Sequence, residues 1–178
     1  MIGRITTLMY GIFCYLVFFA TFLYAVAFLG GFGVSRTIDS GVEGSLAQAM
    51  AINTGLLALF ALQHSIMARS WFKRAWTRIV PPAAERSTYV LFSSLALILL
   101  FWQWRPIGGV VWQVDNEFGQ MLIYLIYATG WMLLLLATFL INHFDLFGLR
   151  QAYLHFLGQE YAGLEFRTPG LYLSLIHI

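Results

Sequence analysis

The stretch FGQMLIYLIYATGWMLLLLATFLI (Phe118–Ile141) runs directly into NHFDLFGLRQ (Asn142–Gln151). Its first part contains no charged residue and is long enough to cross a bilayer, which needs about 20 mainly apolar residues. Its second part places polar and ionisable side chains at the end of that run, namely Asn142, His143, Asp145 and Arg150. Such groups are costly in a membrane and usually functional. The stretch therefore predicts a membrane enzyme whose active site lies where a spanning helix meets water.

The composition of the whole chain is that of an integral membrane protein. Hydrophobic residues make up 60% of the chain and charged residues 10%, whereas soluble domains carry about 25% charged residues. The formal charge of +2 is too small for a nucleic-acid-binding face. Cys14 is the single cysteine, so the sequence gives no internal disulfide, no CxxC motif and no zinc site. We expect Cys14 to be a small apolar core or lipid-facing residue.

We predict an all-α fold, a polytopic membrane helix bundle with four transmembrane helices. The expected spans are Leu8–Leu29, Leu46–Met67, Thr88–Trp104 and Phe118–Ile141. The first span is not interpreted as a signal peptide, because its apolar run is too long and no small-residue cleavage site follows it.

Basic residues in short loops predict the orientation, because cytoplasmic loops of membrane proteins carry more Lys and Arg. The loop after the second span is basic and contains Arg69, Lys73, Arg74, Arg78 and Arg86 against Glu85 alone. We therefore expect this loop, the N-terminus and everything after Ile141 to be cytoplasmic. Tryptophans near the span ends fit an interfacial aromatic belt; they are Trp71, Trp76, Trp102, Trp104 and Trp112.

This orientation brings ionisable groups from three parts of the sequence to one membrane face: His64, Glu85 with Arg86, and His143 with Asp145. His64 either is satisfied by a backbone carbonyl or headgroup water at its helix end, or contacts a substrate. It has no HxxxH or HxxE partner that would indicate a metal ligand.

His143 and Asp145 point about 200° apart on a continuous helix, so a pair between them requires the helix to end there. Gly148 follows and is a common helix terminator. Asn142 and Asp145 are three residues apart and are able to share a face. Asp145 is either a solvated or capping carboxylate near Arg150, or a base or substrate-orienting group.

Two other polar segments favour structural interpretations. Glu85–Tyr89 (ERSTY) resembles a helix start, with Ser87 as a cap and Glu85 paired with Arg86. The basic loop, in which Trp71 and Trp76 are interleaved with cations, predicts an amphipathic helix on anionic headgroups. Pro81-Pro82 should end that helix and start the third span in an extended conformation.

Three segments resemble the bacterial methanethiol S-methyltransferase family, which is similar to isoprenylcysteine carboxyl methyltransferases. They are ALQHSIMARSWFKRAWTRIVPPAAERSTYVL (Ala61–Leu91), LLFWQWRP (Leu99–Pro106) and TFLINHFDLFGLRQAYLH (Thr138–His155). The likeness extends from about Ala51 to Tyr172. The resemblance implies methyl transfer from S-adenosyl-L-methionine to methanethiol, giving dimethyl sulfide, at the bacterial inner (cytoplasmic) membrane.

On this resemblance we expect Asp145 or His143 to act as the catalytic base, since the nucleophile is a thiolate. His64, Asn142, Arg86 and Arg150 are expected to bind the substrate, with Arg86 or Arg150 favouring the thiolate. The expected partners are a small thiol and the lipid bilayer, with no nucleic acid and no metal. Two alternatives remain: methylation of another thiol, isoprenylcysteine or lipid, and a non-catalytic, denitrification-associated membrane protein.

The end of the chain departs from the resemblance. Relatives continue after the TPGLY segment (Thr168–Tyr172) with a basic Arg-His-Pro motif that belongs to the cofactor site, whereas this chain reads LSLIHI (Leu173–Ile178). LSLIHI is a literal translation of a transposase adapter used in library preparation. We therefore expect residues 1–172 to be an incomplete methyltransferase domain and residues 173–178 to be adapter sequence. The chain as written should then lack most of the cofactor site and be inactive.

Overall fold

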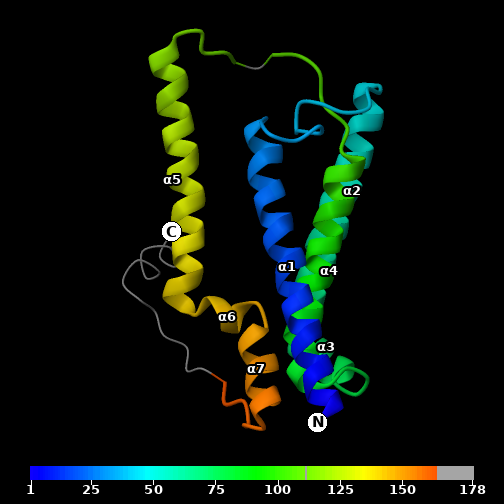
Figure 1. Ribbon diagram of the computed structural model, residues 1–178. Coiled ribbons are helices and arrows are strands. Elements are labelled where there is room, and N and C mark those ends of the chain that lie inside the picture. The colour runs from blue at the N-terminus through cyan, green and yellow to red at the C-terminus, as the bar shows by residue number, and fades with distance from the viewer. Residues whose placement is uncertain (111, 164–178) are drawn as a thin grey trace. The chain divides into compact units, whose positions relative to one another are not determined.

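The computed structural model describes residues 1–110 and 112–163, and these residues are mainly helical. The helices are α1 (Ile2–Gly30), α2 (Leu46–Ala68), α3 (Ser70–Trp76), α4 (Pro82–Gln103), α5 (Glu117–Ile141), α6 (His143–Leu146) and α7 (Leu149–Leu157) (Figure 1). Four of them, α1, α2, α4 and α5, are long and apolar enough to cross a membrane. The predicted all-α fold with four spans is confirmed. The expectation about Leu173–Ile178 concerns residues outside the described part.

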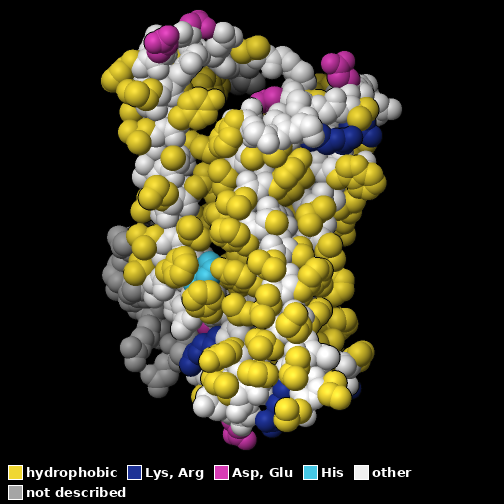
Figure 2. Space-filling model, in the orientation of Figure 1, with side chains coloured by type: hydrophobic (Ala, Val, Ile, Leu, Met, Phe, Trp, Pro, Cys, Tyr) yellow, Lys and Arg dark blue, Asp and Glu magenta, His cyan; other side chains and the backbone are white. Residues whose placement is uncertain are grey.

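The helices fall into two compact units. The first contains α1 to α4 together with α7, and the second contains α5 and α6. Hydrophobic side chains cover the helix surfaces, and charged side chains gather near the helix ends (Figure 2). This distribution fits helices surrounded by lipid along their length and by water at their ends.

The third span begins earlier than predicted, at Pro82 rather than Thr88. Pro81 is extended, with φ −54° and ψ 138°, and Pro82 occupies the first helical turn. Proline is favoured there because its missing N–H would have no helical partner in any case. Ser87 is therefore not a helix cap, as the ERSTY segment suggested, but a fully buried residue inside α4.

The short helix in the basic loop is present as α3, between Arg69 and Thr77. Its tryptophan Trp76 packs edge-on against Phe92 of α4, with ring centroids 6.3 Å apart. This contact joins α3 to the middle of α4.

Aromatic packing holds the far end of the first unit, where α1 ends and α4 ends. Phe28 and Phe101 form its centre, with ring centroids 4.9 Å apart. The indole N–H of Trp104 donates to the Ile38 carbonyl over 2.9 Å. Trp104 is therefore a partly buried structural residue, in contrast to Trp102, which is 60% exposed.

A reciprocal pair of hydrogen bonds joins α2 to the chain beyond α4. The Asn53 side-chain amide donates to the Arg105 carbonyl over 2.7 Å and accepts the Arg105 N–H over 3.0 Å. Both backbone groups of Arg105 lie past the end of the α4 ladder, so they need partners from outside that helix. Asn53 is buried in a span, and both its side-chain nitrogen and its side-chain oxygen are hydrogen-bonded.

At the other end of the first unit, small residues let α7 approach α1 and α4 closely. A Cβ on Gly11 would lie 2.8 Å from the Cβ of Ala152, and one on Gly148 would lie 2.5 Å from the Ser87 backbone nitrogen. The Ser87 hydroxyl donates to the Gly148 carbonyl over 3.3 Å. Gly148 also has φ +83°, a conformation that strongly favours glycine. The sequence thus fixes α7 beside the start of α4 and the first half of α1.

Cys14 is completely buried, which confirms the core alternative for this residue.

Candidate active site

The helix break after α5 occurs at Asn142, earlier than the terminator Gly148. Asn142 has φ 148° and ψ 90°. Among the residues that the structure describes, it is the one non-glycine residue with a positive φ. Such a backbone costs about 1–3 kcal/mol and is concentrated at functional sites. The Asn142 side-chain oxygen accepts the Asp145 N–H over 3.3 Å. Asn142 therefore ends one helix and caps the next, α6.

His143 is buried in the second unit, with 2% of its surface exposed. Its ring stacks on Phe139 with centroids 4.2 Å apart and an interplanar angle of 4°. Its Nδ1 lies 2.8 Å from the Thr138 hydroxyl oxygen, and that hydroxyl donates its proton to the Leu135 carbonyl over 2.6 Å. The hydroxyl must therefore accept from Nδ1–H, which assigns the lone pair of the neutral ring to Nε2.

Burial lowers the pKa of His143 below its ordinary value, because desolvation disfavours the charged imidazolium. The neutral ring with a lone pair on Nε2 is the form that accepts a proton. This arrangement fits a base, the role predicted for His143.

Asp145 follows in the same short helix and is 8% exposed. This burial argues against the solvated form of the first alternative, whereas a capping carboxylate near Arg150 and a base or substrate-orienting group both stay predictions. Side chains two positions apart point to different sides of a helix, so α6 directs His143 and Asp145 differently. Asn142 contacts Asp145 through the backbone cap described above, and the prediction that their side chains share a helix face stays a prediction.

His64 lies near the end of α2 in the first unit and bonds to side chains of α4. Its Nδ1 is 3.2 Å from the Ser93 hydroxyl, and its Nε2 is 2.8 Å from the Tyr89 hydroxyl. Within the described residues its hydrogen-bond partners are these side chains rather than a backbone carbonyl. Sequence reasoning missed Tyr89 and Ser93, although their spacing of four residues places both on one face of a helix.

The two predicted arginines also belong to the first unit. Arg86 lies one turn before Tyr89 on α4, and Arg150 lies in the first turn of α7. The Arg150 guanidinium is 6.0 Å from the centre of the Tyr161 ring. Because the end of α2 and the start of α4 flank α3, and α7 packs beside the start of α4, His64, Arg86 and Arg150 share one end of the first unit. The structure thus brings His64 and Arg86, two of the groups predicted to share a membrane face, to one end of the first unit; that they share this face with His143 and Asp145 stays a prediction.

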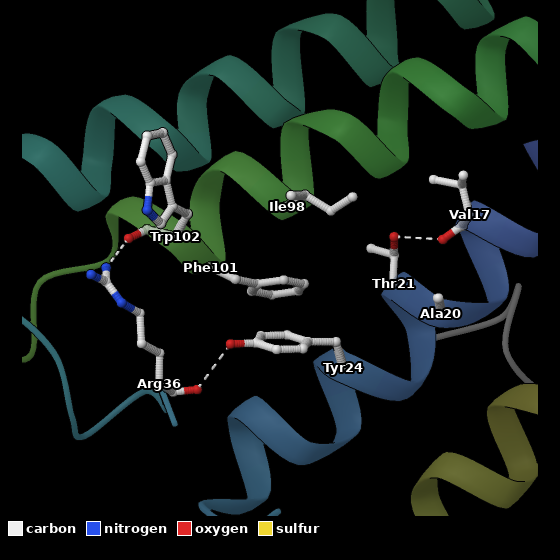
Figure 3. A pocket seen from close by; sticks show the side chains of 8 residues that line it. All are labelled: Val17, Ala20, Thr21, Tyr24, Arg36, Ile98, Phe101 and Trp102. Carbon is white, nitrogen blue, oxygen red and sulfur yellow. Dashed lines mark hydrogen bonds between the residues drawn. The ribbon is translucent and has the colours of Figure 1, made fainter. Parts of the chain in front are cut away.

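A cavity of about 540 Å³ lies between α1 and α4 in the first unit (Figure 3). It is lined by Val17, Ala20, Thr21, Tyr24, Arg36, Ile98, Phe101 and Trp102. Its polar groups bond to the protein itself: Tyr24 donates to the Arg36 carbonyl, Arg36 to the Trp102 carbonyl, and Thr21 to the Val17 carbonyl. The cavity lies toward the C-terminal ends of α1 and α4, away from His64, and suits an apolar occupant.

Comparison with known proteins identifies several relatives. The chain is 53% identical over 176 residues to methanethiol S-methyltransferase of Crocosphaera subtropica, covering 99% of this chain and 69% of that protein. It is 49% identical to methanethiol S-methyltransferase 1 of Bradyrhizobium diazoefficiens, covering 99% of this chain and 62% of that protein. It is 47% identical to methanethiol S-methyltransferase of Mycobacterium tuberculosis, covering 98% and 71% respectively.

A more distant relative is human nurim, at 35% identity over 120 residues, which covers 64% of this chain and 45% of nurim. No family model and no solved structure matches the chain. The similarity to the Crocosphaera protein takes in 176 of the 178 residues, so it begins well before Ala51 and does not single out Leu173–Ile178. The chain spans between about three fifths and three quarters of the length of these bacterial relatives. With half of its residues identical to a protein of which it covers more than two thirds, the chain belongs to the methanethiol S-methyltransferase family.

Proposed function

We propose that this protein transfers a methyl group from S-adenosyl-L-methionine to methanethiol, giving dimethyl sulfide and S-adenosylhomocysteine. The observation that carries the proposal is 53% identity, over 99% of the chain, to a methanethiol S-methyltransferase. The proposed location is the bacterial inner membrane, with the N-terminus and α3 on the cytoplasmic side. The basic loop around α3 supports this orientation through its excess of Arg and Lys.

The chemistry requires a thiolate and a fixed line of attack. The sulfur of the thiolate attacks the methyl carbon as the bond from that carbon to the donor sulfonium breaks. Thiolate rather than thiol is the nucleophile, so a group must take the proton. Holding two reactants in line supplies much of the rate. Methanethiol is small and partitions into lipid, which suits an enzyme whose polar groups lie at the ends of membrane helices.

We assign proton removal to Asp145, with His143 as the second candidate. Asp145 is a nearly buried carboxylate whose backbone is fixed by Asn142. His143 is held in the tautomer that has a lone pair on Nε2 by Thr138. The positively charged Arg86 and Arg150 are assigned to favour the thiolate, because a nearby cation lowers the pKa of an acid. His64 is assigned to the substrate.

The cavity between α1 and α4 does not fit S-adenosyl-L-methionine. The cavity between α1 and α4 has no carboxylate in its lining, and its one cation, Arg36, bonds to a backbone carbonyl. A zwitterionic sulfonium with an adenine ring requires more polar partners than this lining provides. We therefore assign no described residue to bind the methyl donor and derive no step through it.

The test is production of dimethyl sulfide by membranes that contain this protein. Two forms are expressed in a bacterium that makes no dimethyl sulfide: the chain itself, and a chimera that adds the portion of the Crocosphaera relative that the chain does not cover. Both receive methanethiol, and headspace dimethyl sulfide is measured by gas chromatography. We expect product that depends on added S-adenosyl-L-methionine from the chimera. A chimera that inserts into the membrane and makes none would reject methanethiol as the acceptor, and larger thiols, isoprenylcysteine and lipids would be tried next.

A further inference from the structure

A hydrogen-bonded chain of side chains links α4 to α2 and back, through Ser93, His64 and Tyr89. Ser93 and Tyr89 are one helical turn apart on α4, and His64 lies between them on α2. The His64 ring also packs against Phe60, with centroids 5.4 Å apart, and against Tyr89, with centroids 5.1 Å apart. The ring is therefore fixed from both sides by aromatic contacts.

The direction of this hydrogen-bonded chain follows from the proton of Ser93. Neighbouring hydroxyls on α4 donate to the carbonyl one turn earlier, Thr88 to Ala84 and Ser94 to Val90. Ser93 differs, because the hydrogen bond that its hydroxyl makes within the described chain is the one to His64 Nδ1. The Tyr89 hydroxyl likewise bonds to the His64 ring within the described chain, 3.0 Å from Nδ1 and 2.8 Å from Nε2, so the tautomer decides which hydroxyl donates. With Ser93 as the donor, Nδ1 is the acceptor and the ring proton lies on Nε2.

The Nε2–H group then donates to the Tyr89 oxygen, 2.8 Å away. Tyr89 accepts this bond and keeps its own hydroxyl proton. In the part of the chain that the structure describes, the hydrogen-bond contacts of the Tyr89 hydroxyl are with the His64 ring. The Tyr89 hydroxyl proton is therefore available to a group other than these described residues. Hydrogen bonds in series polarise one another, which makes the Tyr89 hydroxyl a stronger donor.

The surroundings favour an anionic acceptor for this donor. Tyr89 and the exposed His64 lie within membrane-spanning helices, where a polar group without a partner is costly. Arg86 lies about one turn earlier on the same helix, beside the carboxylate of Glu85, and Arg150 lies at the same end of the unit, so these two arginines outnumber the neighbouring carboxylate. A small anion that arrives through the membrane edge is the occupant that satisfies the donor next to these cations.

We propose that the Tyr89 hydroxyl binds the sulfur of the thiol substrate and stabilises its thiolate, with His64 and Ser93 as positioning residues behind it. The inference rests on the proposed function. The thiol proton leaves to the base, the Tyr89 O–H donates to the resulting S⁻, and that bond is given up as the sulfur lone pair forms the new bond to the methyl carbon. Tyr89 neither gains nor loses a proton over the reaction.

The first experiment compares Tyr89→Phe with Tyr10→Phe in the form that makes dimethyl sulfide. Tyr10 is the matched control because its hydroxyl bonds to Thr88, beside Tyr89 on α4, at 3.1 Å and takes no part in the chain to His64. A hydrogen bond to a charged group is worth about 1.5–3 kcal/mol, so Tyr89→Phe should lower kcat/KM for methanethiol about 10- to 100-fold. Tyr10→Phe should change it less than about threefold.

Two readouts separate sulfur binding from a structural role. Without the donor, the pKa of the bound thiol rises, so the rising limb of kcat/KM against pH should move to higher pH in Tyr89→Phe. With an acidic thiol such as trifluoroethanethiol, which ionises readily, the loss should shrink to a few-fold. An equal loss for both thiols, with no shift of the pH profile, overturns the inference. If the unmutated chimera makes no dimethyl sulfide, the proposed function itself has failed.

A second experiment needs no activity and uses the chain as it is. Diethyl pyrocarbonate modifies the ring nitrogen that carries the lone pair, and mass spectrometry of the His64 peptide gives the rate. Ser93→Ala should accelerate modification of His64, because it releases Nδ1, whereas the neighbouring Ser94→Ala should not. Acceleration by Tyr89→Phe but not by Ser93→Ala would mean that Tyr89 donates to His64, and it would overturn the assignment.

Discussion

The two histidines His64 and His143 show opposite solutions to the problem of an imidazole at the edge of a membrane. His143 is buried and has near neighbours along the chain among its partners, Thr138 and Phe139. His64 is exposed and bonds to residues 25 and 29 positions away, Tyr89 and Ser93. The two rings are assigned opposite tautomers, Nδ1–H in His143 from its contact with Thr138 and Nε2–H in His64 under the inference above. One ring is prepared to accept a proton, and the other passes a hydrogen bond outward.

The largest expected effect tests whether the segment around His143 takes the proton from the thiol. Asp145→Asn keeps the shape of the side chain but removes its basicity. General-base catalysis contributes about 10²–10⁴-fold, so turnover of methanethiol to dimethyl sulfide should fall by that factor in the active chimera. Asn116→Asp, which alters a helix cap outside this segment, serves as a charge-changing control. Full turnover by Asp145→Asn would leave His143 as the base.

Gly148→Ala tests the packing of α7 against α4 at the end of the first unit that carries His64. The added Cβ would lie 2.5 Å from the Ser87 nitrogen at a residue with φ +83°. Overpacking and the positive φ together should cost about 2–4 kcal/mol, seen as a lower midpoint of thermal unfolding in detergent by circular dichroism. Gly163→Ala, with nothing within 4 Å of the new Cβ, should leave the midpoint nearly unchanged. Equal midpoints for the two variants would show that α7 does not depend on this contact.

Thr138→Val tests the local hydrogen bond between Thr138 and His143. This change leaves the buried Nδ1–H of His143 without its acceptor, which should cost about 1–3 kcal/mol. Thr129→Val is its match on the same helix, because Thr129 is exposed and its hydroxyl donates to the Leu125 carbonyl. Denaturant unfolding of the two variants should differ by at least about 1 kcal/mol. A smaller difference would mean that the tautomer of His143 is set by another contact.

The smallest expected effect is a dependence of stability on pH. Burial lowers the pKa of His143, so the unfolded chain binds its proton more readily than the folded one. The stabilisation is complete above the unfolded value of about 6.5 and is lost as pH falls toward the folded pKa. Between pH 7.5 and 5.5 the unfolding free energy should fall by about 1 kcal/mol, and His143→Phe should flatten that part of the curve. An identical slope in both proteins would assign the pH dependence to other groups.

The fold was predictable where apolar runs are long. The four spans follow from hydrophobic length alone, and the errors lie at their polar ends. The start of α4 was missed because Glu85, Arg86 and Ser87 read as a loop and cap, whereas Pro82 is already helical. Ser87 is buried by Gly148, 61 residues later, and a contact of that separation leaves no periodic signal in the sequence.

The same distinction governs the site. The spacing of three between Asn142 and Asp145 indicated a local relation, but the backbone cap that joins them depends on the helix break at Asn142. Tyr89 and Ser93 were not predicted, because a hydroxyl in a membrane helix usually bonds to its own backbone, as Thr88 and Ser94 do. Their role depends on the facing of α2 and α4, which composition and periodicity do not determine. His64 was identified as an unusual residue for a span, but its partners required the structure.

The reciprocal hydrogen bonds between Asn53 and Arg105 have a consequence for membrane insertion. Asn53 is synthesised 52 residues before Arg105, which at about 5–20 residues per second is roughly 3–10 s. During that interval Asn53 has no Arg105 carbonyl or N–H to bond, so α2 carries an unsatisfied amide at the bilayer. Arrival of the chain beyond α4 relieves this cost, which couples the insertion of α2 to the completion of the helix that follows it.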